Sequence, residues 1–118
     1  MDYILVVDDE KSIRYLMKDA LEYYGYKVTA ACSGQEGLKY FNSEHRFKLV
    51  ITDIKMPIMG GIEFAKALRN SDRPNIPIIA ITAYPSNKEI EENLFNSVIG
   101  KPFNFDSLRK IISQHLES

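Results

Sequence analysis

The sequence has 118 residues, of which 45% are hydrophobic and 26% are charged, and this composition excludes an intrinsically disordered chain. The length suffices for one domain with a single core but not for two. With a formal net charge of −1 and no apolar run near the ~20 residues of a membrane span, we expect neither nucleic acid nor a membrane as a direct partner.

Five apolar runs have the length and β-branched character of buried strands. They are residues 3–7, 27–31, 49–53, 78–82 and 97–99. Most of these runs are followed directly by polar or turn-forming residues. The pattern predicts short strands that are covered on both faces.

Apolar residues at helical spacing follow each run. The first helix carries a stripe from Ile13 to Tyr24 and ends before Gly25, which is suited to a C-terminal cap. The second begins at the capping box of Ser33 and Glu36 and is expected to end near residues 42–45.

Three more helices are predicted along the second half of the chain. The third carries apolar positions from Gly61 to Leu68, and the fourth is a short acidic helix from a second capping box at Ser86 through Leu94. Asn104 is placed to cap the last helix, whose apolar stripe ends at Leu116. Strand and helix thus alternate five times, which predicts an α/β fold with a parallel sheet and helices on both faces.

One cysteine, Cys32, excludes a disulfide framework and a cysteine-based metal cluster, and we expect it to be a small, buried or half-buried residue. The start of the chain has neither a basic region nor a long apolar stretch, so no secretory signal is expected. A cytoplasmic location follows as the simplest interpretation. The whole sequence, residues 1–118, is interpreted as one domain, with no additional output domain.

Polar side chains stand where four of the predicted strands end. Asp8 and Asp9 follow the first strand, Asp53 ends the third, Thr82 ends the fourth and Lys101 follows the fifth. Because the carboxyl ends of parallel strands lie at one edge of the sheet, these residues are expected to converge on one site.

The chemistry of this set points to phosphoryl transfer. Three carboxylates without histidine or cysteine suit a hard cation, and Mg²⁺ fits best. Asp53 is the candidate nucleophile, Lys101 supplies positive charge and Thr82 a hydroxyl donor. The small side chain of Ala83 leaves an approach to the site open.

The sequence resembles the receiver domains of response regulators in two-component and phosphorelay signalling, over essentially its whole length. The segments that carry the resemblance are residues 6–10 (VVDDE), 52–57 (TDIKMP) with Gly61, 81–83 (ITA) and 101–103 (KPF). The resemblance implies a flavodoxin-like three-layer sandwich, with a five-stranded parallel sheet in the order 2-1-3-4-5 flanked by five helices.

The same resemblance implies roles for the site. Asp53 would be phosphorylated by a sensor histidine kinase or a phosphotransfer protein, and Asp8, Asp9, Asp53 and the main-chain carbonyl of Lys55 would bind Mg²⁺. Thr82 and Lys101 would contact the phosphoryl group, and the bond between Lys101 and Pro102 would be cis.

Three features depart from the family pattern or vary within it. Val98 stands where most receivers carry an aromatic residue that reports phosphorylation, and the segment between Thr82 and Lys101 is a few residues short. Lys55 and Tyr84 flank the site, where they either shield an aspartyl-phosphate from water or are solvated loop residues.

Two other functions remain open at this point. A small Mg²⁺-dependent phosphohydrolase with an aspartyl-phosphate intermediate uses similar residues, but it places its two aspartates two apart, whereas Asp8 and Asp9 are adjacent. A receiver-like docking domain without phosphorylation is disfavoured by the complete acidic set. We therefore expect a phosphoacceptor that changes partner binding and does not turn over an external substrate.

Overall fold

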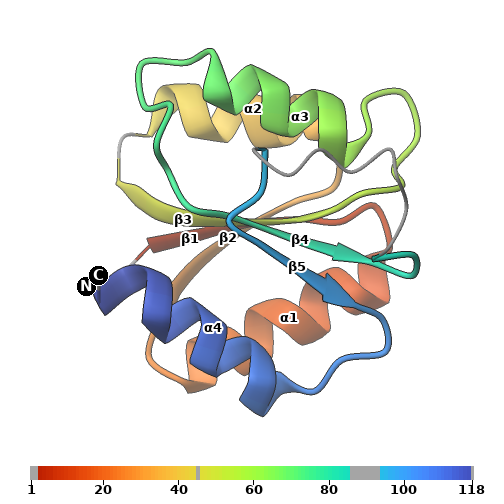
Figure 1. The fold of residues 1–118 in the computed structure, drawn as a ribbon, viewed down its shortest axis with the longest axis vertical. Helices are drawn as coiled ribbons and strands as arrows, with labels where there is room; N and C mark the ends of the chain where they lie inside the picture. Colours follow the sequence, from red (N-terminus) through yellow and green to blue (C-terminus); the bar gives the residue numbers. More distant parts are fainter. Residues whose placement is uncertain (1–2, 45, 86–93, 118) are drawn as a thin grey trace.

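The computed structural model describes residues 3–44, 46–85 and 94–117, in which strands and helices alternate along the chain (Figure 1). The strands are β1 (Tyr3–Val7), β2 (Lys27–Ala31), β3 (Phe47–Asp53), β4 (Ile78–Thr82) and β5 (Ser97–Gly100). The helices are α1 (Lys11–Tyr23), α2 (Gly34–Ser43), α3 (Gly61–Arg69) and α4 (Phe105–Glu117).

All five strands form one parallel sheet in the order β2-β1-β3-β4-β5. Helices α2 and α3 cover one face of the sheet, and α1 and α4 cover the other (Figure 1). The predicted three-layer, flavodoxin-like architecture and its strand order are confirmed. This order makes β1, β3, β4 and β5 successive neighbours, so their carboxyl ends stand side by side.

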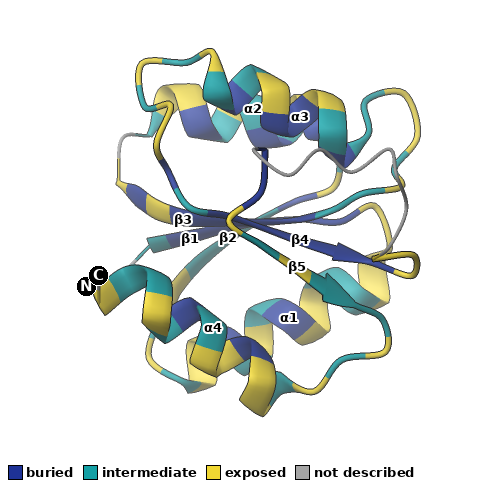
Figure 2. Ribbon diagram, in the orientation of Figure 1, coloured by how far each residue is buried: buried dark blue, intermediate teal, exposed yellow. Residues whose placement is uncertain are grey.

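Alternate residues of the buried strands supply two separate cores, because successive side chains of a strand point to opposite faces. In β4, Ile78 and Ala80 pack with the residues of α2 and α3, whereas Ile79 and Ile81 pack with those of α1 and α4. Figure 2 shows β4 buried along its length. A strand that is covered on both faces needs apolar side chains at every position, which explains the continuous runs in the sequence.

The predicted helix signals have their physical counterparts in the structure. The Ser33 hydroxyl accepts a hydrogen bond from the main-chain N–H of Glu36 at 3.1 Å, and the Glu36 carboxylate accepts one from the N–H of Cys32 at 3.0 Å. The Asn104 side chain accepts one from the N–H of Ser107 at 2.7 Å. Gly25 follows α1 with a φ of +99°, a conformation that glycine adopts without strain.

Two expectations need correction. Within residues 3–44, 46–85 and 94–117 the structure contains four helices, not five; the helix predicted from Ser86 falls on residues 86–93, outside the described part, and Leu94 lies in a turn. Cys32 is exposed, because it is the first residue beyond the edge strand β2, which has a sheet neighbour on one side only. No helix of the described residues has both the length and the apolar character needed to cross a membrane.

Candidate functional site at the carboxyl edge of the sheet

The structure brings the predicted polar residues together at one edge of the sheet. Asp8 and Asp9 follow β1, Asp53 is the last residue of β3, Thr82 is the last residue of β4 and Lys101 follows β5. Thr82 pairs with Gly100 in the register of β4 and β5, which fixes how far Lys101 stands along the edge. The convergence follows directly from the parallel strand order.

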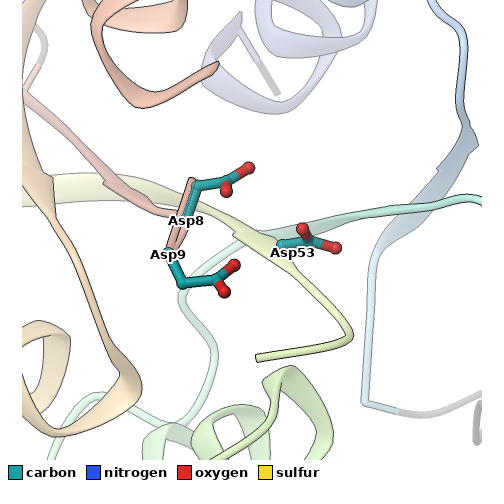
Figure 3. A group of neighbouring side chains, drawn as sticks. All are labelled: Asp8, Asp9 and Asp53. Carbon is teal, nitrogen blue, oxygen red and sulfur yellow. The ribbon is translucent and has the colours of Figure 1, made fainter. Parts of the chain in front are cut away.

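Three carboxylates form the acidic part of the site. One carboxylate oxygen from each of Asp8, Asp9 and Asp53 lies within 4.8 Å of the others, and Figure 3 shows the three side chains grouped at the ends of β1 and β3. Asp8 is buried, Asp9 is exposed, and the side chain of Asp53 is 11% exposed. The cluster therefore opens to solvent on the side of Asp9.

Burial and crowding make the charged form of Asp8 unfavourable. Burial raises the pKa of Asp8 to about 6, and the negative charges of Asp53 and Asp9 act in the same direction. The main-chain N–H of Glu10, which donates to Asp8 Oδ1 at 2.9 Å, and the charge of Lys101 oppose the rise. A cation bound among these oxygens would remove the unfavourable charge.

Asp53 is held by two hydrogen bonds, one to each carboxylate oxygen. The main-chain N–H of Ile54 donates to Oδ1 at 2.8 Å, and Lys101 Nζ donates to Oδ2 at 2.9 Å. Burial lowers the pKa of Lys101, but its hydrogen bond to Asp53 and the nearby acidic charges outweigh this and raise it. Lys101 is therefore a fixed positive charge beside the Asp53 carboxylate.

The loop after β3 folds back tightly behind Asp53. The main-chain N–H of Gly61 donates to the carbonyl oxygen of Ile54 at 2.8 Å, and a Cβ atom at Gly61 would overlap the carbonyl oxygen of Asp53. Only glycine fits this close approach of two main-chain segments. The Gly60-Gly61 pair in the sequence thus serves to begin α3 directly against the end of β3.

Thr82 stands on the other side of Asp53 and is 3% exposed. Its hydroxyl oxygen accepts a hydrogen bond from the main-chain N–H of Tyr84 at 3.1 Å, and its carbonyl oxygen accepts one from the N–H of Lys101 at 2.8 Å. Ala83 is exposed beside it. The predicted cis bond between Lys101 and Pro102 is present.

The structure adds two features that sequence reasoning did not identify. Lys55 Nζ lies 4.9 Å from the ring centroid of Tyr84, so the two flanking residues contact each other as a cation–π pair. An apolar groove of about 410 Å³ lies between α1 and the segment leading into α4. It is lined by Ile13, Leu16, Met17, Lys101, Pro102, Phe103 and Phe105.

Leu16 belongs to the apolar stripe predicted for α1, yet the structure leaves it 53% exposed beside the groove. Val98, the position without the usual aromatic residue, pairs with Ala80 in the sheet and is 38% exposed. Val98 is therefore an exposed aliphatic residue of β5, at the position where most receivers carry an aromatic residue that reports phosphorylation.

Acidic residues that face a lysine and a threonine at the carboxyl edge of a doubly wound sheet define a class of proteins built for phosphoryl chemistry on an aspartate. Residues 4–113 match the family model described as the response regulator receiver domain. The chain therefore belongs to the receiver-domain family of two-component signalling.

The share of a relative's length that matches this chain differs from one relative to another. The chain is 34% identical to sporulation initiation phosphotransferase F of Bacillus subtilis, over 96% of this chain and 92% of that protein. It is 42% identical to the autoinducer sensor kinase/phosphatase CqsS of Vibrio cholerae, over 89% of this chain but 16% of that protein. The chain thus spans nearly all of one relative and a small part of the other.

Solved structures give the same family. Response regulator TrrA of Thermotoga maritima, solved with Mg²⁺ and BeF, is 38% identical, with a TM-score of 0.88 and coverage of 98% and 99% of the two chains. TrrA has also been solved in complex with histidine kinase ThkA; that match is 39% identical with a TM-score of 0.85, covering 98% of this chain and 99% of that chain.

Proposed function

We propose that this chain is a phosphoacceptor receiver of a two-component or phosphorelay system, and that Asp53 accepts the phosphoryl group from a phosphohistidine. The observation that carries the proposal is the setting of the Asp53 carboxylate. It is held by the Ile54 N–H and Lys101 and lies within 4.8 Å of two further carboxylates. The single domain over residues 1–118 is part of this proposal.

The reaction moves one group between two side chains. A carboxylate oxygen of Asp53 forms a bond to phosphorus, the bond between phosphorus and the donor histidine nitrogen breaks, and the released imidazole takes up a proton from solvent. Lys101 Nζ, now bonded to Asp53 Oδ2, is placed to neutralise the charge of the incoming phosphoryl oxygens. The Thr82 hydroxyl oxygen accepts from the Tyr84 N–H, so its own hydrogen is available to donate to that group.

The residues fit Mg²⁺ as the cofactor. The crowded oxygens, with no nitrogen or sulfur ligand among them, match its preference. Asp8, Asp9, Asp53 and the main-chain carbonyl of Lys55 would hold the ion. When bound, Mg²⁺ supplies positive charge to the phosphoryl oxygens.

We further propose that each molecule of the protein accepts one phosphoryl group on its own side chain and does not turn over an external substrate. The phosphodonor is a sensor histidine kinase or a phosphotransfer protein, and the apolar groove beside α1 is suited to receive it, because it opens next to Lys101. The downstream partner is a protein whose binding changes with phosphorylation. A cytoplasmic location is consistent with the exposed, unpaired Cys32, which suits a reducing compartment.

The proposal is tested by incubating the protein with phosphoramidate and Mg²⁺ and measuring its intact mass. We expect one added phosphoryl group on the wild type, none on Asp53→Asn, and one on the control Asp72→Asn, whose side chain is 71% exposed. A label that persists in Asp53→Asn would refute the assignment of the phosphoacceptor. Repeated turnover of a chromogenic phosphate ester would instead favour the phosphohydrolase.

A further inference from the structure

Ile58, in the loop between β3 and α3, adopts a conformation that isoleucine rarely takes. Its φ is +67°, and among the described residues it is the one non-glycine residue with a positive φ. The N–H of Met59 donates to the carbonyl oxygen of Pro57 at 2.8 Å, which closes a three-residue turn around Ile58. This is the rarer, strained form of the γ-turn, and a β-branched side chain increases the strain.

Packing within the chain does not compensate for this strain, because the Ile58 residue is 89% exposed. The rest of the loop is anchored. Met59 packs against Gly34 at the start of α2 and against the core under α2 and α3, and Gly61 is bonded to Ile54. The anchored loop therefore holds Ile58 outward, in one fixed conformation, with an apolar side chain in water.

The position of Ile58 indicates what its side chain contacts. The loop begins at Asp53, so Ile58 stands at the rim of the candidate phosphoacceptor site, on the side of α2 and α3. The Asp53 side chain is 11% exposed, so a phosphohistidine on a protein reaches it only when the donor covers this rim. The apolar groove beside α1 lies on the opposite face of the sheet from α2 and α3 (Figure 1), so a donor protein would contact the chain on both sides of Asp53.

We propose that Ile58 is a specificity-determining contact for the protein phosphodonor and inserts into an apolar socket next to the donor's phosphohistidine. This inference rests on the proposed function of Asp53. The partner is a histidine-containing kinase or phosphotransfer protein, because a small phosphodonor such as phosphoramidate offers no apolar surface to the exposed Ile58 side chain. The strained turn presents the side chain in its bound conformation, so docking does not have to order it.

The test compares two variants of Ile58 with a matched control. Ile58→Asn removes the apolar contact and tolerates a positive φ, while Ile58→Leu keeps an apolar side chain of the same size. Tyr23→Asn is the control, because Tyr23 is 88% exposed and ends α1, at the opposite edge of the sheet. The probe is chosen first: autophosphorylated sensor kinases of the same genome are each mixed briefly with the wild type, and the fastest donor is used.

For Ile58→Asn we expect kcat/KM for transfer from that kinase to fall about 10-fold or more, since an apolar side chain loses its buried partner surface. The same variant should unfold about 2 to 6 °C higher, because the strain is relieved. Ile58→Leu should transfer within about threefold of the wild type, since it preserves the apolar surface. Labelling by phosphoramidate should be unchanged in all three variants.

Equal transfer rates in the wild type and Ile58→Asn would overturn the inference, and so would an equal loss in Tyr23→Asn. A wild type that is labelled by phosphoramidate but by none of the kinases would also overturn it, while leaving the role of Asp53 intact. Absence of any label from phosphoramidate on the wild type would instead overturn the proposed function itself.

Discussion

The two edges of the sheet each hold a partly buried cation, and the two cations are bound in opposite ways. At the amino edge, where the parallel strands begin, Arg69 donates five hydrogen bonds. Its acceptors are the carbonyl oxygens of Pro74, Ile76 and Leu94 and the side chain of Asn96. At the carboxyl edge, Lys101 donates to the charged carboxylate of Asp53.

The difference separates a structural site from a chemical one. The acceptors of Arg69 are neutral and use every N–H of the guanidinium, and burial lowers its pKa without a carboxylate to oppose it. Lys101 instead faces an excess of negative charge from Asp8 and Asp53, which a bound cation or a phosphoryl reaction can change. The neutral acceptors around Arg69 use all of its N–H groups and hold the chain in place. The charges around Lys101 are not balanced, so binding of a cation or a phosphoryl group changes them.

Replacing Arg69 should produce the largest loss of stability. Arg69→Met leaves several main-chain carbonyl oxygens without partners, and we expect the free energy of unfolding to fall by at least about 3 kcal/mol in urea titrations. Phosphorylation by phosphoramidate at a temperature where the variant is folded should be nearly unchanged. Arg109→Met, at an exposed position of α4, should cost less than about 1 kcal/mol. A small loss in Arg69→Met would mean that the network is not structural.

Replacing Lys101 should have the complementary effect. Lys101→Met removes the positive charge beside Asp53, and we expect labelling by phosphoramidate to slow roughly 100-fold with Mg²⁺ present. Rates are measured by intact mass over time, with Lys39→Met, an exposed residue of α2, as the control. Normal labelling of Lys101→Met would show that the charge has no part in the reaction.

Asp8→Asn should stabilise the metal-free protein. The pKa of Asp8 is about 6 in the folded chain and 3.8 in the reference state, so the folded state binds the proton more tightly. The contribution of Asp8 to stability is therefore largest below pH 4 and is lost as the pH rises to about 6. Urea titrations with EDTA should show the variant more stable above pH 6 by on the order of 1 to 3 kcal/mol, with the gap closing near pH 4. A gap that does not vary with pH would contradict this origin.

The smallest expected effect concerns the lifetime of the phosphorylated state. If the Lys55 and Tyr84 pair shields the site from water, Lys55→Ala and Tyr84→Ala should each lose phosphate a few-fold faster, and the double variant should add little, because each depends on the other. Phosphate loss is followed after removal of the donor. Unchanged rates in both single variants would leave the two as solvated loop residues.

The carboxyl edge could be predicted from the sequence because its signals are local. A polar residue interrupts each apolar run at Asp8, Asp53 and Thr82, and the parallel arrangement then aligns the strand ends without further information. The two cores were equally predictable, since apolar runs without alternation require cover on both faces.

The amino edge could not be predicted, for a physical reason. Most acceptors of Arg69 are main-chain carbonyl oxygens, which every residue carries and no sequence pattern marks. The turn at Ile58 was hidden for the opposite reason, because a β-branched residue argues against a positive φ. The contact between Lys55 and Tyr84 depends on side-chain rotamers of two separate loops.

The Arg69 network also has a consequence for the register of β5. Because Arg69 bonds to Leu94 and Asn96, and Asn96 also accepts from the N–H of Ile78, the start of β5 is anchored to both α3 and β4. The register that carries Lys101 to Asp53 is therefore held at both ends of β5, at the amino edge by Asn96 and at the carboxyl edge by the hydrogen bond from the Lys101 N–H to the Thr82 carbonyl oxygen.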